Sequence, residues 1–224
     1  SIIGTAYILK VTAMDLDLPQ YTFGPYMVDV TEIKGIGVAI TSIPNLPANS
    51  YVVYIVIESI HNDYYTGDWS QGVVLTIYEP SGDFVTGGGW LYDSDGNRAN
   101  FGFNVKYKKN GLPGGQSIYV YREGDWEYLI KSNAWLGMAI EENHAFFEGK
   151  CTVQKFNIKT GELVWDEGNY QFRVDVWDND EDGGVDVYQI RVLDKNGLVF
   201  YDAGFDPLGY LEGGNVIIHR DPKN

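Results

Sequence analysis

The chain has 224 residues, which at about 150 residues per domain corresponds to one large or two small domains. It carries 16 Lys and Arg against 31 Asp and Glu, a formal net charge of −15. This charge excludes nucleic acid as a partner, because binding to polyanions depends on clustered cationic side chains. Hydrophobic residues make up 44% and aromatic residues 15% of the chain, more than a disordered acidic segment carries. We therefore expect a folded body that binds cations.

The composition predicts an all-β protein, because 27 Gly, 17 Tyr and many runs of Val and Ile are typical of short strands joined by tight turns. The spacing of Pro, Gly and Asn clusters favours an antiparallel two-sheet β-sandwich or jelly roll. The predicted strands are Ile2–Met14, Tyr26–Val30, Gly35–Ile40, Tyr51–Ile60, Val73–Tyr78, Phe101–Tyr107, Ser117–Tyr121, Tyr170–Trp177, Val187–Leu193, Leu198–Tyr201 and Asn215–His219. Asn196-Gly197 predicts a hairpin between two of them.

One segment conflicts with this assignment. Ser132–Phe147 is rich in Ala, Leu, Met and Glu, which favour a helix. The sequence alone leaves helix and strand open here. A turn signal at Glu79–Asp83 predicts either a boundary between residues 1–85 and 86–224 or only a long turn within one continuous sandwich.

The N-terminal strand is apolar on both faces over Ile2–Val11 and precedes a segment, Asp15–Pro25, that contains two prolines. Two interpretations remain open. The strand is either the first strand of its own sheet or a donated strand that pairs with a neighbouring subunit. In the second case Ile3, Tyr7 and Leu9 are candidate partner-binding residues.

The expected compartment is extracellular. The only cysteine, Cys151, cannot form an internal disulfide, and no apolar stretch reaches the ~20 residues that cross a bilayer. The first residue, Ser1, suits a processed terminus of an exported protein and equally a trimmed chain.

An ordered series of short motifs runs through the second half of the chain. They are Gly87-Gly88-Gly89-Trp90, Ala99-Asn100-Phe101-Gly102-Phe103, Lys106-Tyr107-Lys108-Lys109, Gly183-Gly184-Val185-Asp186, Val199-Phe200-Tyr201-Asp202 and Gly213-Gly214-Asn215-Val216-Ile217-Ile218-His219. The series resembles a β-domain found at the C-termini of large secreted bacterial surface proteins. This resemblance implies an extracellular β-rich domain with strands over 132–149, and no particular reaction. The chain departs from that pattern by an insertion at Asn157–Trp165. Residues 1–85 more weakly resemble subunits of archaeal extracellular tubules and pili.

The strongest local signal is acidic. Asp178, Asp180, Asp182 and Asp186 alternate with other residues in a short, glycine-containing segment. Oxygen ligands spaced in this way can surround one Ca²⁺ ion. The segment is not an EF-hand, because Gln189 stands at the twelfth position and the flanks are predicted strands. The alternative is a solvated acidic turn, in which the carboxylates would repel one another.

A second candidate calcium site is formed by Asp93, Asp95 and Asn97 around Gly96. A plain Asp-Gly turn explains this pattern equally well. Further acidic residues in predicted loops are Asp15, Asp17, Asp63 and Asp68.

We predict that the chain is not an enzyme. His61, His144 and His219 lie far apart in the sequence, without zinc-site spacing, and the sequence lacks nucleophile-elbow and phosphate-loop motifs. Glu141, Glu142 or Glu148 could form a glycosidase pair, but such pairs arise by chance among so many acidic residues. The six tryptophans, Trp69, Trp90, Trp126, Trp135, Trp165 and Trp177, suit either core packing or a sugar-binding face, and Trp177 is expected at the surface or between the two halves of the chain.

The sequence thus predicts a secreted, calcium-stabilised structural subunit of a cell-surface or extracellular filament or tubule, which self-assembles into a homopolymer. The alternative is a calcium-dependent adhesion or carbohydrate-binding module, with a glycan as the partner.

Overall fold

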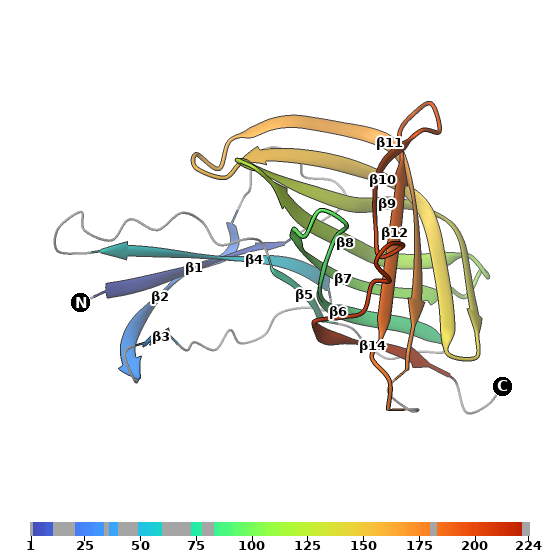
Figure 1. Cartoon of the computed structure of the whole chain (residues 1–224), viewed down its shortest axis with the longest axis horizontal. Helices are drawn as coiled ribbons and strands as arrows, with labels where there is room; N and C mark the ends of the chain where they lie inside the picture. Colours follow the sequence, from blue (N-terminus) through green and yellow to red (C-terminus); the bar gives the residue numbers. More distant parts are fainter. Residues whose placement is uncertain are drawn as a thin grey trace.

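The computed structural model describes residues 2–10, 21–33, 36–39, 49–59, 73–77, 83–179 and 183–220. These residues form β-strands and connecting turns and contain no helix, so the all-β prediction is confirmed (Figure 1). The strands are β1 (Ile2–Lys10), β2 (Tyr21–Ile33), β3 (Ile36–Ala39), β4 (Asn49–Ser59), β5 (Val73–Ile77), β6 (Phe84–Tyr92), β7 (Arg98–Tyr107), β8 (Pro113–Glu123), β9 (Trp126–Glu141), β10 (His144–Asn157), β11 (Leu163–Trp177), β12 (Val187–Leu193), β13 (Val199–Ala203) and β14 (Gly213–His219).

Two sheets are present. One has the order β3-β2-β1-β4-β5 and the other β13-β12-β11-β10-β9-β8-β7-β6-β14, and the pairings in both are antiparallel. The chain passes from the first sheet to the second between β5 and β6. The segment Glu79–Asp83, predicted as a boundary or a long turn, lies outside the described residues except for Asp83.

The nine-stranded sheet curls around its own core. Strands β6 to β13 follow one another as neighbours, and β14 returns to pair with β6 (Figure 1). Side chains alternate between the two faces along each strand, and the concave face carries most of the aromatic residues. Phe101 and Tyr188 stack there with ring centroids 4.0 Å apart, and Phe147 packs against Phe103 at 5.0 Å. These rings are almost completely buried.

The Ser132–Phe147 segment is not helical. It contains the end of β9, a turn, and the beginning of β10, with Glu141 opposite His144 and Met138 opposite Phe147. Glu142 has φ 47°, a left-handed conformation that an α-helix does not contain. The helix-forming residues adopt strand because Met138, Ala145 and Phe147 all bury their side chains in the same core, and tertiary burial outweighs propensity.

The predicted hairpin at Asp194–Gly197 is confirmed. The Asp194 N–H donates to the Leu198 carbonyl at 2.8 Å, and Gly197 has φ 80°. A glycine with positive φ closes the turns at 93–97 and 108–112 in the same way. The inserted segment Asn157–Trp165 is likewise a turn, closed by a hydrogen bond from the Asn157 N–H to the Glu162 carbonyl, followed by the first residues of β11.

The two sheets contact each other. Strands β4 and β5 lie against β7 and β8, and Val74 on β5 is 8% exposed. The side of β7 to β9 that faces away from the aromatic core carries buried residues as well, among them Ile118, Val120 and Leu129.

Candidate functional site

The predicted calcium segment lies between β11 and β12 and contacts β14. The backbone N–H of Val216 donates to Asp186 Oδ2 at 2.7 Å, and the N–H of Ile218 donates to Asp178 Oδ2 at 2.9 Å. Asp186 Oδ1 also accepts a hydrogen bond of 2.8 Å from the Asn179 N–H. The two carboxylates therefore join the β11–β12 connection to the last strand of the sheet.

This arrangement follows from the position of β14 at an edge. β14 pairs with β6 on one side only, so every second N–H points away from the sheet. Val216 and Ile218 are two residues apart and present such groups. An edge strand with unpaired N–H groups is a site of unwanted strand pairing, and the two aspartates satisfy two of these donors.

The geometry bears on the calcium prediction in two ways. Two of the four candidate ligands have a charge-compensating role that needs no metal ion, because backbone N–H groups stabilise a carboxylate. Each carboxylate offers about four lone-pair sites, so the N–H bonds leave room for a cation as well. Asp180 and Asp182 lie outside the described residues, and within the described ones no group of His, Cys, Asp and Glu is arranged to hold a metal ion.

The second candidate calcium site forms a hydrogen-bonded turn. Asp93 Oδ1 accepts from the backbone N–H groups of Asp95 at 3.1 Å and Asn97 at 2.8 Å. Asp93 Oδ2 accepts from Asn97 Nδ2 and from the Tyr201 hydroxyl, both at 3.3 Å. Asp93 is 5% exposed, whereas Asp95 is exposed. The Asp93 carboxylate thus links the β6–β7 turn to β13.

Tyr201 extends this link into the core. Its hydroxyl lies 3.0 Å from that of Tyr119. Burial, and secondarily the neighbouring Tyr119, raises the pKa of Tyr201, and burial raises the pKa of Tyr119. Both phenols are therefore hydrogen-bonding groups at physiological pH. The sequence contained no spacing signal for this cluster.

The candidate partner-binding residues Ile3, Tyr7 and Leu9 all lie on β1. β1 is the central strand of the five-stranded sheet and pairs along its length with β4, with Ile3 opposite Glu58, and with β2, with Ile3 opposite Asp29. Within this chain, both edges of β1 are therefore occupied by its own neighbours. Asp15, Asp17, Asp63 and Asp68 lie outside the described residues.

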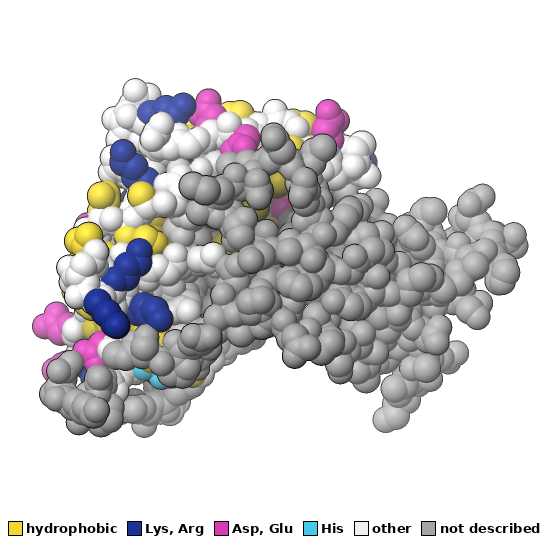
Figure 2. All heavy atoms as spheres, turned by 180° about the vertical axis from the view of Figure 1, so that it is seen from behind, with side chains coloured by type: hydrophobic (Ala, Val, Ile, Leu, Met, Phe, Trp, Pro, Cys, Tyr) yellow, Lys and Arg dark blue, Asp and Glu magenta, His cyan; other side chains and the backbone are white. Residues whose placement is uncertain are grey.

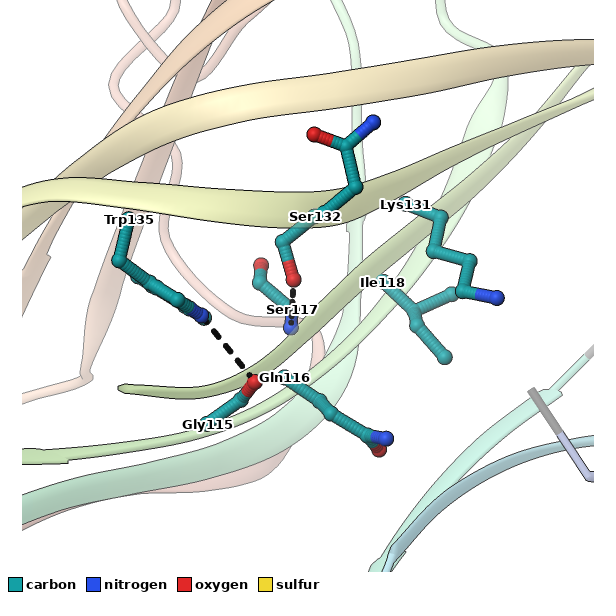
Figure 3. Close-up of a pocket in the computed structure, with 8 residues that line it drawn as sticks. Gly115, Gln116, Ser117, Ile118, Lys131, Ser132 and Trp135 are labelled. Carbon is teal, nitrogen blue, oxygen red and sulfur yellow. Dashed lines mark hydrogen bonds between the residues drawn. The ribbon is translucent and has the colours of Figure 1, made fainter. Parts of the chain in front are cut away.

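Strands β8 and β9 separate at a small pocket of about 80 Å³ (Figure 3). Their pairing ends at Ile118 and Lys131. Beyond that point the Ser117 N–H donates to Ser132 Oγ at 2.9 Å, and Trp135 Nε1 donates to the Gly115 carbonyl at 3.2 Å. Burial lowers the pKa of Lys131, which lines this pocket, to about 8, with the Asp166 carboxylate opposing part of that effect.

A further cluster lies on the convex face of β10 to β13, and sequence reasoning found only Trp177 of it. The Trp177 and His144 rings stack at 4.5 Å with an interplanar angle of 22°. His144 Nε2 lies 3.1 Å from Asp175 Oδ1, and Arg173 donates to both Asp175 oxygens at 2.7 and 2.9 Å. Two-residue parity along β11 places Trp177, Asp175 and Arg173 on one face, and cross-strand register, which the sequence did not supply, adds His144.

The other tryptophans do not form a common face. Trp126, Trp135 and Trp165 pack against the core cluster, and Trp69 lies outside the described residues. The Arg98 guanidinium lies 4.3 Å from the Trp90 ring centroid. Cys151 is buried and unpaired, as predicted, and burial raises the pKa of its thiol to about 12.

The carboxylates considered for a glycosidase do not share one position. Glu141 and Glu142 are exposed at the β9–β10 turn, whereas Glu148 lies on β10 with Oε2 4.0 Å from Arg173 Nη1. His219 stacks on Phe84 at 4.0 Å near the start of β6, and His61 lies outside the described residues.

In the described part of the chain, no helix is long and apolar enough to span a membrane. Comparisons of the chain with protein-family models, with curated proteins and with solved structures found no match.

Proposed function

We propose that the protein is a secreted, calcium-stabilised structural subunit of an extracellular filament or tubule, whose copies join by exchange of β1. The observation that carries this proposal is the position of β1 between β2 and β4. β2 and β4 are not neighbours, so withdrawal of β1 leaves a slot with two unpaired edges. The same strand of a second copy fits that slot with the same hydrogen bonds, which is the principle of strand exchange and strand addition.

Calcium has a defined place in this proposal. Asp178 and Asp186 hold the β11–β12 connection against β14, and an ion shared with Asp180 and Asp182 would reinforce that contact. Figure 2 supports association with a protein partner rather than a polyanion, because the described surface in that view mixes basic, acidic and hydrophobic side chains.

A cross-linking experiment tests strand exchange. Thr5 and Val56 are opposite each other on β1 and β4, so cysteines at both positions form a disulfide wherever these two strands pair. After oxidation of assembled protein, we expect a ladder of covalent oligomers on non-reducing gels. A matched pair at Thr86 and Asn104, opposite each other on β6 and β7, is expected to cross-link only within one chain.

If the Thr5–Val56 pair also gives only monomers in assembled samples, β1 stays in its own sheet and exchange is excluded. If the wild-type chain remains monomeric with and without calcium in electron microscopy and light scattering, the assembly function itself is wrong.

A second function has its own supporting observation. The cluster of His144, Asp175 and Trp177 on an exposed sheet face favours a calcium-dependent adhesion or carbohydrate-binding module. The two functions differ in a simple measurement. A building block polymerises alone on addition of calcium, whereas an adhesion module stays monomeric until its ligand is present.

A further inference from the structure

We propose that the convex face of β10 to β13 binds a neutral glycan, through a platform formed by His144, Arg173, Asp175, Trp177, Arg191 and Phe205. This inference deepens the second function above and does not depend on assembly. It rests on three features of the platform: exposed flat rings, fixed polar groups of alternating character, and a near-neutral local charge.

The apolar part of the platform consists of partly exposed rings. Trp177 is stacked on His144 at 4.5 Å, which fixes the plane of the indole. Phe205 is 41% exposed, and the Arg191 guanidinium lies 4.4 Å from its ring centroid. Flat rings of this kind match the C–H face of a pyranose, which is the apolar part of a sugar.

The polar part is held in place before any ligand binds. Asp175 accepts two hydrogen bonds from Arg173 and lies within hydrogen-bond distance of His144. Arg191 Nη2 donates to Asp202 Oδ2 at 3.2 Å. A sugar hydroxyl both donates and accepts, so neighbouring guanidinium donors and carboxylate acceptors satisfy both capacities. Fixed side chains also reduce the entropy lost on binding.

The cross-strand register contains a feature that does not serve stability. Arg173 lies directly opposite Arg191, and like charges in that position destabilise a sheet. Each arginine turns to a separate carboxylate and ring: Arg173 to Asp175 and Phe146, and Arg191 to Asp202 and Phe205. An unfavourable pair kept on an exposed face indicates a binding role.

The charge balance selects the ligand class. The two guanidinium groups face the carboxylates of Asp175, Asp202 and Glu148, so two positive charges against three negative ones leave −1. This balance does not attract a polyanion, whereas a neutral polysaccharide needs no net charge. The bare alternatives are a network that only stabilises the fold and a contact face for a second copy.

Calorimetric titration of the full chain with three neutral probes, cellohexaose, laminarihexaose and chitohexaose, tests the proposal. We expect saturable binding of at least one probe and a change in tryptophan fluorescence. Trp177→Ala and Asp175→Ala are each expected to weaken binding about tenfold or more. Tyr92→Ala removes an exposed aromatic side chain from β6, far along the sheet order from β10 to β13, and is expected to leave binding within about twofold.

Phe205→Ala guards against misfolding, because the side chain is exposed and its loss should leave near-ultraviolet circular dichroism unchanged. It is expected to weaken binding several-fold. Absence of binding to all three probes overturns the proposal, as does equal weakening by Tyr92→Ala. Loss of assembly in the Thr5–Val56 experiment leaves these outcomes unaffected, so the two proposals fail separately.

Discussion

The Asp186 carboxylate accepts a hydrogen bond of 2.7 Å from the backbone N–H of Val216, 30 residues further along the chain. Asp186 is 3% exposed and stands at the start of β12, whereas Val216 lies on the edge strand β14. This contact and its neighbour between Asp178 and Ile218 hold the last strand to the β11–β12 connection. The acidic segment therefore has a structural role in addition to the calcium binding proposed for it.

Removal of the Asp186 carboxylate should destabilise the protein. Asp186→Ala leaves the N–H groups of Val216 and Asn179 without their acceptor, and each buried unsatisfied donor costs about 1–3 kcal/mol. We expect a loss of about 3 kcal/mol in the free energy of unfolding, measured by urea denaturation. Asp95→Ala, at an exposed turn position, is the control and should change it by less than about 0.5 kcal/mol. Equal effects would show that Asp186 is only a surface carboxylate.

Gly149 is expected to tolerate no side chain. A Cβ at this position would lie 2.0 Å from the Ala134 carbonyl oxygen, whereas a Cβ at Gly168 would meet only Thr152 Oγ1 at 3.7 Å. Gly149→Ala should therefore cost more than about 2 kcal/mol, because the β9 backbone must move. Gly168→Ala should cost less than about 1 kcal/mol. Thermal unfolding of the pair decides this, and similar melting temperatures would contradict the β9–β10 register.

Lys131 should make stability depend on alkaline pH. Burial lowers its pKa in the folded protein to about 8 from 10.5, so between these pH values the unfolded chain binds more protons. The contribution of Lys131 to stability therefore rises with pH across that window. The free energy of unfolding of the wild type, relative to Lys131→Met, is expected to increase from pH 7 to pH 10 in urea titrations. Exposed Lys150→Met is the control, and a flat difference for Lys131→Met would contradict the burial of its amine.

Calcium removal tests the metal prediction separately from the hydrogen bonds. Extracellular calcium sites have dissociation constants of about 10⁻⁴–10⁻³ M, and a tenfold excess of free ion over that constant stabilises the fold by about 1.4 kcal/mol per site. We expect a chelator to lower the melting temperature, and Asp180→Asn combined with Asp182→Asn to abolish that response. A wild-type melting temperature that does not change with chelator means that the segment binds no calcium.

The elements with regular alternation could be predicted from the sequence. β11 and β12 were found because Phe172, Val174 and Val176 alternate with polar residues and bury on one face. The hairpin at Asn196-Gly197 was found because its turn requires a residue with positive φ. β6 was missed because its Gly87-Gly88-Gly89 run has low strand propensity, and β9 and β10 were ambiguous because Ala, Leu, Met and Glu favour helix in isolation.

The sequence by itself determined the all-β class, the strand-forming segments and the acidic character of the β11–β12 connection, because these depend on residue type and local periodicity. Only the tertiary structure decided that Asp178 and Asp186 contact β14, that Asp93 contacts Tyr201, and that His144 joins Trp177 on one face. These pairs lie in different strands and turns, and their contacts depend on sheet order and register. Register is fixed by the summed burial of side chains across many strands, which no local pattern contains.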